Sequence, residues 1–424
     1  MNGEGRRALK TAILANDATE VAAVLVRHPE LTTHLDDPLP DFEFGATPLL
    51  GAVYRNNREM IDVLLRAGAD INARSGWWAG SFGVLDHDGA LSEFLIARGA
   101  TVDVHAAARL GLLDRLDALI AADPGLLRAR GGDGQTPLHF AASVEVAEYL
   151  LAHGADIDAL DVDHESTPAQ YMVRDRQDVA RYLVSRGCRT DVLLVSALGD
   201  EARVRQHLDS DPLAIRTSVS DECFPKRNPH GGGTIYTWTL GAGKTAHIVA
   251  SDFGRDRVLR LLMERTPDEL KLAIACEMGD EATVNTLLAS DPTLVGRLTA
   301  FERRKLPDAA RDGNATAVRL MLAAGFPVDA RGQHGATPLH WAGFNGDREM
   351  ARDLLRYSAS LEIHDRDFDG TPLFWTIYGS VHGWRRATGH YAETVELLLN
   401  AGAQLPEKTD VEGSEAVRDV LRRR

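Results

Sequence analysis

Two short stretches of this 424-residue chain place a histidine among carboxylates. Asp86 and His87 lie in the stretch LDHDG, and His164 and Glu165 lie in DVDHE. A neighbouring carboxylate raises the basicity of an imidazole, so each stretch suits general acid and base catalysis. The alternative interpretation is that these acidic residues form Asx turns and solvate a loop. Asp86, His87, His164 and Glu165 are therefore the candidate catalytic residues.

Aromatic and basic side chains in irregular stretches are the candidate ligand-binding residues. Tryptophan is enriched among the residues that dominate binding energy, and large exposed apolar groups mark interaction surfaces. For two of the tryptophans, at 341 and 375, the alternative is packing between neighbouring repeats. The candidates are Trp77, Trp78, Tyr171, Arg174, Tyr236, Trp238, Lys244, His247, Trp341, Trp375, His382 and Trp384.

No spacing in the chain is typical of a metal or cofactor site. There is no H-E-x-x-H, no H-x-H and no cysteine pair, since Cys188, Cys223 and Cys276 are far apart. A zinc site assembled from distant loops has no support in the sequence. The stretch HGGG at 230–233 is similar to the oxyanion segment of esterases, but their G-x-S-x-G does not occur. We predict no metal and no cofactor, and we interpret HGGG as part of a loop insertion.

The charge and the apolar content of the chain limit the kinds of partner that it is expected to bind. The chain carries 62 acidic and 47 basic residues, a formal net charge of −15, and an acidic chain repels phosphate backbones. We therefore expect no nucleic-acid binding. No stretch approaches 18 consecutive apolar residues and no signal peptide is visible, so we expect a cytoplasmic protein that does not span a membrane. The Ala-, Arg- and Asp-rich composition is typical of a high-GC bacterial source.

The elements that must position these residues come from an internal repeat. The clearest copies are GATPLLGAVYRNNREMIDVLLRAGADINAR from Gly45, GQTPLHFAASVEVAEYLLAHGADIDAL from Gly134, GATPLHWAGFNGDREMARDLLRYSASLEI from Gly335, and GTPLFWTIYGS…YAETVELLLNAGAQL from Gly370. The pattern resembles the ankyrin repeat. Weaker copies fill the gaps and give about twelve units from near Ala8 to near Leu405.

The chemistry of the repeat predicts pairs of helices. A threonine can cap the first helix, and the proline after it needs no N–H partner at that position. The V-x-x-L-L runs give each second helix an apolar face, and a glycine follows it where a left-handed residue ends the helix. His139 and His340 occupy a slot in which the resemblance implies a hydrogen bond to a neighbouring turn.

The resemblance implies an all-α ankyrin-repeat solenoid of stacked helix-turn-helix units joined by hairpin tips. We expect one continuous array over 1–405, with insertions near 75–83, 217–243 and 379–391, and a capping segment over 406–424. Tips and first helices would line the concave side, which biases the tryptophans toward it. A complete array with a polar cap is expected to be a monomer.

The stretch TLGAGKTAHIV at 239–249 is similar to the end of a phosphate-binding loop. That loop requires G-x-x-x-x-G-K-[ST] after a strand, but the position of its first glycine is Trp238. Thr245 also fits the capping slot of a repeat. We therefore interpret the stretch as a hairpin tip and predict no nucleotide binding.

Two functions are compatible with these observations. The first is an interaction module that binds a protein partner through the concave groove. The second is a small-molecule binding protein, with a sugar as one possible ligand, or an acid/base enzyme of lyase or hydrolase type with a pocket on the same face. Convergence of the specialised residues in one pocket would favour the second. The sequence does not assign a reaction.

Overall fold

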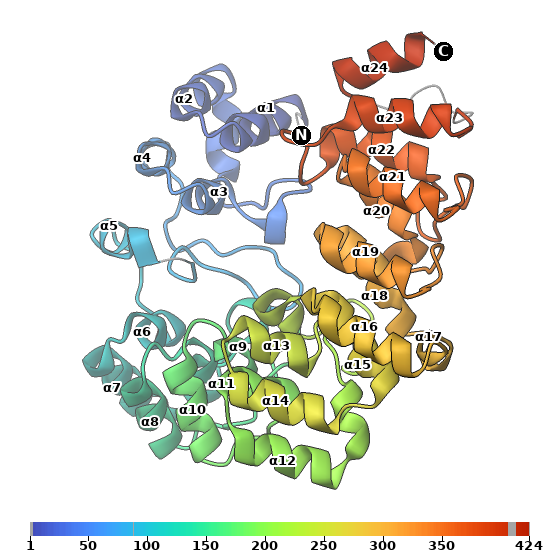
Figure 1. Cartoon of the computed structure of the whole chain (residues 1–424). Coiled ribbons are helices and arrows are strands. Elements are labelled where there is room, and N and C mark those ends of the chain that lie inside the picture. Colours follow the sequence, from blue (N-terminus) through green and yellow to red (C-terminus); the bar gives the residue numbers. More distant parts are fainter. Residues whose placement is uncertain (1–2, 88, 406–412, 424) are drawn as a thin grey trace. The chain divides into compact units, whose positions relative to one another are not determined.

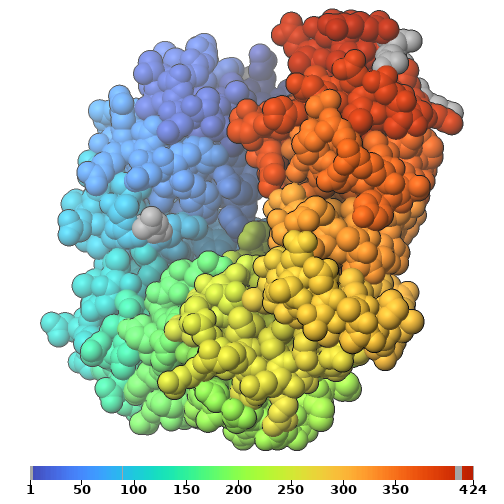
Figure 2. All heavy atoms as spheres, viewed as in Figure 1, coloured from blue at the N-terminus to red at the C-terminus, as the bar shows by residue number. Residues whose placement is uncertain are grey.

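The computed structural model describes residues 3–87, 89–405 and 413–423 (Figure 1). The chain divides into two compact units, Met1–Arg255 and Asp256–Arg424, called unit 1 and unit 2 below. Each unit is compact by itself. Figure 2 shows one face of the chain with all atoms as spheres, coloured along the sequence. Within the described residues the only strand-like pairing is one isolated antiparallel bridge between Ser218 and Thr245. The all-α prediction is confirmed.

Unit 1 contains successive pairs of short helices. The first helices are α1 (Gly3–Leu14), α3 (Pro48–Tyr54), α6 (Val104–Leu110), η6 (Pro137–Phe140), α9 (Pro168–Met172), α11 (Val192–Leu198) and α13 (Ala246–Asp252). The second helices are α2 (Ala18–Arg27), α4 (Arg58–Arg66), α5 (Ser92–Ile96), α7 (Leu113–Ala122), α8 (Val144–Ala152), α10 (Gln177–Ser185) and α12 (Glu201–Ser210). The connecting turns are η1 (Pro29–His34), η2 (Glu43–Gly45), η3 (Gly89–Leu91), η4 (Pro124–Arg128), η5 (Gly132–Gly134), η7 (Pro212–Arg216) and η8 (Thr237–Gly241).

Unit 2 has the same pattern. Its first helices are α15 (Asp268–Met278), α18 (Lys305–Asp312), α20 (Pro338–Phe344) and α22 (Pro372–His382). Its second helices are α14 (Asp256–Arg265), α16 (Glu281–Ser290), α19 (Ala315–Ala323), α21 (Arg348–Arg356) and α23 (Tyr391–Asn400). The remaining elements are α17 (Leu294–Arg297), η9 (Glu302–Arg304), η10 (Gln333–Gly335) and α24 (Glu415–Arg422).

Within each unit, first helices stack on first helices and second helices stack on second helices. In unit 1, α1 packs on α3 and α2 on α4; in unit 2, α20 packs on α22 and α21 on α23. The stacking buries aliphatic side chains in continuous cores, one of which runs from Leu9 to Ala106 and another from Leu272 to Val417. Each repeat therefore completes its core only against its neighbours, as in a solenoid.

The Thr-Pro starts act as the sequence predicts. Thr47 and Thr371 directly precede α3 and α22, and their hydroxyls accept hydrogen bonds from the backbone N–H three residues later, at 3.3 Å in both cases. Thr245 also holds the position before α13, but its buried hydroxyl has no hydrogen-bond partner among the described residues. Its place in the repeat is therefore confirmed, whereas capping by its side chain is not observed.

The specialised insertions are loops. Residues 75–83 replace the first helix of their repeat, and the chain between η7 and α13 returns along itself through hydrogen bonds between Val219 and residues 243 and 244. Of the predicted capping segment, residues 406–412 and 424 lie outside the described residues, and α24 packs on α23. No helix in the described part of the chain is long and apolar enough to cross a membrane.

Candidate functional site

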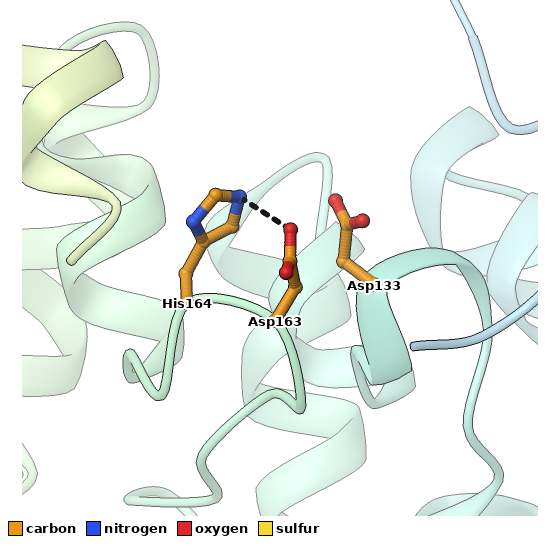
Figure 3. A group of neighbouring side chains, drawn as sticks. All are labelled: Asp133, Asp163 and His164. Atoms are coloured by element: carbon orange, nitrogen blue, oxygen red, sulfur yellow. Dashed lines mark ion pairs between the residues drawn. The ribbon is translucent and has the colours of Figure 1, made fainter. Parts of the chain in front are cut away.

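Three ligand-type side chains from two hairpin tips converge in unit 1. Asp133 lies in η5, and Asp163 and His164 lie in the next tip, between α8 and α9 (Figure 3). One oxygen or nitrogen atom of each lies within 4.8 Å of the others. The Asp163 carboxylate lies 3.5 Å from Nε2 of His164, and these two side chains are only 7% and 9% exposed. This group is called the tip cluster below.

Backbone groups fix the orientation of His164. Its Nδ1 lies 2.8 Å from the carbonyl oxygen of Gly233. A carbonyl oxygen only accepts, so Nδ1 carries the proton and donates it. In the neutral ring, Nε2 then presents a lone pair toward Asp163. The backbone N–H of His164 donates to Asp161, whose carboxylate also accepts from Ser166 and Tyr171.

One oxygen of each carboxylate in the tip cluster is held by a donor. Trp77 Nε1 donates to Oδ1 of Asp133 at 2.9 Å, and the backbone N–H of Gly232 donates to Oδ1 of Asp163 at 3.0 Å. Asp133 is partly buried, and that burial raises the pKa of its carboxyl above its usual range. Trp77 thus belongs to the supporting shell of this group, with its ring 5.3 Å from Phe44.

The HGGG stretch is explained by its contact with this tip. A Cβ atom on Gly232 would lie 2.8 Å from Cε1 of His164, and one on Gly231 would lie 2.7 Å from the carbonyl oxygen of Asp163. Only glycine permits this approach. Glu165 holds the preceding residues of the same insertion, because its carboxylate accepts the backbone N–H groups of Arg227 and Asn228.

Two cavities adjoin the tip cluster. One, of about 320 Å³, is lined by Asp163, His164 and Glu165 together with residues of the insertion from Cys223 to Asn228. The other, of about 630 Å³, includes Asp133 in its wall. Its other lining residues are Phe44, Phe82, Asp86, His87, Arg109, Gln135, His139, Phe140, Ala142 and Arg176. The larger one is called the aromatic cavity below.

The aromatic cavity brings together the first pair of catalytic candidates, but not as expected. Burial, with Arg109 nearby, lowers the pKa of His87 to about 4, so the prediction of raised basicity is wrong for this residue. The neighbouring Asp86 instead pairs with Arg74 at 3.0 Å. The ring of His87 contacts Tyr54 at 4.3 Å, and two buried atoms, Nε2 of His87 and the Tyr54 hydroxyl, have no hydrogen-bond partner among the described residues.

Several ligand-binding candidates of unit 1 stabilise the repeats instead. Tyr236 and His247 have no exposed surface, and the Tyr236 hydroxyl donates to Asp191 at 2.8 Å. A ligand cannot reach either side chain in this conformation, because core packing covers them. Tyr171 lies in α9 as predicted, and its hydroxyl donates to Asp161.

The remaining candidates of unit 1 lie at the surface. Arg174 donates to the carbonyl oxygen of Thr239, and Lys244 pairs with Asp252 at 2.5 Å. Trp78 is 44% exposed and Trp238 is 73% exposed. Neither tryptophan is among the residues that line the two cavities.

In unit 2 the tryptophans form a continuous aromatic cluster. Trp341 and Trp375 are buried and contact each other edge to face at 5.0 Å. Trp384 stacks on Trp341 with ring centres 5.9 Å apart and planes within 15° of parallel, yet it is 66% exposed. Phe368, 61% exposed, contacts Trp375 at 6.1 Å. His382 ends α22 and stacks on Tyr378 with ring centres 4.4 Å apart.

Reasoning from the sequence missed several residues of these sites. Asp133 sits in GGDGQTP, which reads as an ordinary turn, and Tyr54, Gln135 and Arg176 sit in unremarkable positions of the repeat. The one sequence signal for Asp133 is a comparison of equivalent tips in different repeats. Asp133 stands where the clearest copy in unit 2 has His334, and Asp163 stands where it has Asp367.

Models of the ankyrin repeat match most of the chain. A single "Ankyrin repeat" matches residues 44–76, and "Ankyrin repeats (3 copies)" matches residues 104–193, 272–367 and 306–410. These ranges cover more than half of the 424 residues. The chain belongs to the ankyrin-repeat family. Ankyrin repeats are protein-interaction modules, and the histidine slot of this ankyrin-repeat protein is confirmed, since His139 and His340 each bond a carbonyl oxygen of the next tip.

The chain aligns with 30% or less of the length of three similar proteins. The rice (Oryza sativa subsp. japonica) protein named "Probable E3 ubiquitin-protein ligase XBOS31" is 32% identical over 145 residues, 34% of this chain and 30% of that protein. Rice "E3 ubiquitin-protein ligase XB3" is 34% identical over 102 residues, 24% of this chain and 23% of that protein. "Palmitoyltransferase Hip14" of Drosophila melanogaster is 26% identical over 141 residues, 33% of this chain and 20% of that protein. All three are eukaryotic, so a bacterial source stays a prediction.

Proposed function

We propose that this ankyrin-repeat protein binds a protein partner through the aromatic cluster of unit 2. The observation that supports it most is the exposed ring of Trp384, which stacks on the buried Trp341. The exposed ring of Phe368 belongs to the same cluster through its contact with Trp375. Exposed aromatic side chains held by a buried support lose little conformational freedom on binding. Tryptophan in such a position is typical of binding hot spots. Phe368 lies on a tip and Trp341 and Trp375 lie on first helices, where the sequence predicts the binding face, and Trp384 lies on the insertion that follows α22.

The supporting layer is rigid, which favours a preformed surface. Nε1 of Trp375 donates to Asp365 at 2.9 Å, and that carboxylate also accepts three backbone N–H groups of its own tip. The insertion that carries Trp384 is anchored as well, because the backbone N–H of His390 donates to the carbonyl oxygen of Gly346. A partner that buries apolar side chains against Trp384 and Phe368 would meet rings already in place.

The test starts from a photo-crosslinking amino acid placed at position 384 in the full chain. The same amino acid at Tyr357, which is 49% exposed just after the second helix α21, is the matched control. The partner captured from position 384 is then purified, and its affinity is measured by calorimetry for the parent, Trp384→Ala, Phe368→Ala and Tyr357→Ala. Loss of one hot-spot ring is expected to weaken binding by about 2 kcal/mol, or roughly 30-fold.

The Tyr357→Ala variant is expected to bind like the parent. Equal affinity in Trp384→Ala and the parent would contradict the proposed surface. So would a partner captured equally from positions 384 and 357.

A second function is favoured by the aromatic cavity of unit 1. Its volume of about 630 Å³ is in the range of small-molecule sites. Its wall combines phenylalanine rings with charged groups and includes the ring of His87. We propose a small polar ligand with an apolar ring face for this cavity. A thermal-shift screen of the parent against His87→Phe tests it, since a true ligand should stabilise only the parent.

A further inference from the structure

Equivalent tips in the two units offer an internal comparison. In unit 1, Nη1 of Arg130 donates to the carbonyl oxygens of Gly134 and Leu160; in unit 2, Nη1 of Arg331 donates to those of Gly335 and His364. Because these bonds match, residues 133 and 163 of unit 1 are structurally equivalent to residues 334 and 367 of unit 2. Two further contacts agree, because Val162 N donates to the carbonyl oxygen of Asp133 and Arg366 N to that of His334, both at 2.8 Å.

The side chains at these matched positions differ in charge. In unit 2, Nδ1 of His334 bonds the Asp367 carboxylate at 2.9 Å, so a donor meets an acceptor. In unit 1 the same two positions hold Asp133 and Asp163, which are both acceptors when ionised. The residue after Asp163 is His164, where unit 2 has Phe368. Unit 1 therefore places three metal-ligating side chains at a position where unit 2 has one histidine–carboxylate hydrogen bond.

The buried imidazole is aimed into this group. His164 is 9% exposed, and its Nδ1–H is used by the Gly233 carbonyl, which leaves Nε2 as the free ligand atom. Metal-bound histidines usually donate their second N–H to a carbonyl or carboxylate in this way. Among the described contacts, Nε2 meets only Asp163, at 3.5 Å, which is long for a hydrogen bond. Two ligands each about 2.1 Å from one tetrahedral ion are separated by roughly 3.4 Å.

We propose that the tip cluster, Asp133, Asp163 and His164, binds a divalent first-row transition-metal ion such as Zn²⁺. One imidazole with two carboxylates suits such an ion better than Ca²⁺ or Mg²⁺, which prefer oxygen ligands alone. The ion would be the partner of the two carboxylates, where the equivalent tip has the ring N–H of His334 beside Asp367. Three protein ligands leave a coordination position for water or another molecule from the adjoining cavities. This site is independent of the aromatic cluster of unit 2.

The supporting contacts fit this assignment. Trp77 Nε1 holds one oxygen of Asp133, and the Gly232 N–H holds one oxygen of Asp163. Each carboxylate keeps its second oxygen for an ion. The insertion at 217–243 and the one at 75–83 thus both contribute donors to the shell around the tip cluster, which gives two departures from the ordinary repeat a shared role.

The experiment is a calorimetric titration of the full, chelator-treated chain with Zn²⁺, with Co²⁺ absorption as a second readout. One equivalent is expected to bind to the parent. Asp133→Asn keeps an acceptor for Trp77 but removes the charge, and it should weaken binding at least tenfold, as should His164→Gln. Asp367→Asn, the matched carboxylate of unit 2, should bind like the parent. Cys223→Ser, which removes the exposed thiol beside the smaller cavity, should also leave the affinity unchanged.

Three results would overturn the proposal. The first is no saturable binding to the parent, and the second is parent-like affinity in Asp133→Asn. The third is a Zn²⁺-independent Tm in the parent together with a lowered Tm in Asp163→Asn, which would show a protonated His164 bridging the two carboxylates without metal. If His164→Gln does not fold by circular dichroism, Asp133→Asn decides, since its hydrogen bond to Trp77 is retained.

Discussion

The Nε2–H of His340 donates to the carbonyl oxygen of Gly370 in the next tip, at 3.0 Å, while its Nδ1 accepts the backbone N–H of Thr337 at 3.1 Å. Both ring nitrogens are therefore used by the neutral imidazole. Protonation would place a hydrogen on Nδ1 and break the bond from Thr337. Burial lowers the pKa of His340 from 6.5 to about 4. The two hydrogen bonds favour the same neutral form of the ring.

This relationship predicts acid sensitivity of unit 2. The folded pKa lies below the unfolded one, so the unfolded chain binds the proton first and stability falls as the pH falls. The contribution is complete above pH 6.5 and declines toward pH 4 by up to about 1.4 kcal/mol per pH unit. Urea unfolding at several pH values, followed by tryptophan fluorescence, measures the slope.

The control comes from the chain itself. Gln170 occupies the same slot in unit 1, where its side-chain oxygen accepts the backbone N–H of Thr167 at 2.8 Å. His340→Gln should therefore fold and show a shallower decline below pH 6.5. A decline that is as steep in His340→Gln as in the parent would assign the acid sensitivity to other groups.

A second prediction concerns two buried tryptophans that differ by one hydrogen bond. Trp375 donates from Nε1 to Asp365, whereas the buried Nε1 of Trp341 has no partner among the described residues. Trp375→Phe removes a bond to a charged group and should cost about 1.5–3 kcal/mol beyond the lost ring area. Trp341→Phe removes an unsatisfied donor and should be milder. Chemical denaturation of both variants measures the difference, and equal losses would contradict it.

The fold was predictable because the same short-range sequence signals recur in successive repeats. Thr-Pro at a helix start and glycine after a second helix act within a few residues, so their roles can be seen in the sequence. Gly68, for example, has φ of 104° with no neighbour within 4 Å of an added Cβ, which is a purely local requirement. The histidine slot was also recognisable, because one side chain bonds one adjacent tip.

The site was predictable only in part, because its partners come from different repeats. His164 was a candidate from its own neighbours, but Asp133 is 31 positions away in a common turn sequence. The pKa of His87 also shifts in the direction opposite to the one expected. Burial lowers it, and the flanking carboxylate of Asp86 does not compensate because it pairs with Arg74. Sequence neighbours do not reveal which charge a side chain will face after the tips stack.

A third prediction concerns Glu165, whose carboxylate accepts the backbone N–H groups of Arg227 and Asn228. Glu165→Ala should release this part of the insertion without unfolding the repeats, because the helices on both sides keep their packing. Hydrogen exchange at residues 227 and 228 should rise at least tenfold, with Tm close to the parent's. Glu165→Gln retains one acceptor and should give an intermediate rate.

The matched control for this change is Asp369→Ala at the equivalent tip of unit 2. Asp369 bonds His364 in its own tip, so its loss should leave exchange at residues 227 and 228 unchanged. Unaltered exchange in Glu165→Ala would mean that other contacts hold the insertion.

A final prediction tests why the insertion carries glycine where it meets His164. A Cβ atom on Gly232 would lie 2.8 Å from Cε1 of His164 and 3.2 Å from Oδ2 of Asp163, closer than van der Waals contact permits. Gly232→Ala should therefore displace the loop or the ring and cost about 1–3 kcal/mol. Gly296→Ala in α17 is the control, because its added Cβ meets nothing within 4 Å and should be neutral or slightly stabilising. Differential scanning calorimetry compares the two, and a Gly232→Ala variant as stable as Gly296→Ala would show that the tip can separate from the insertion without loss.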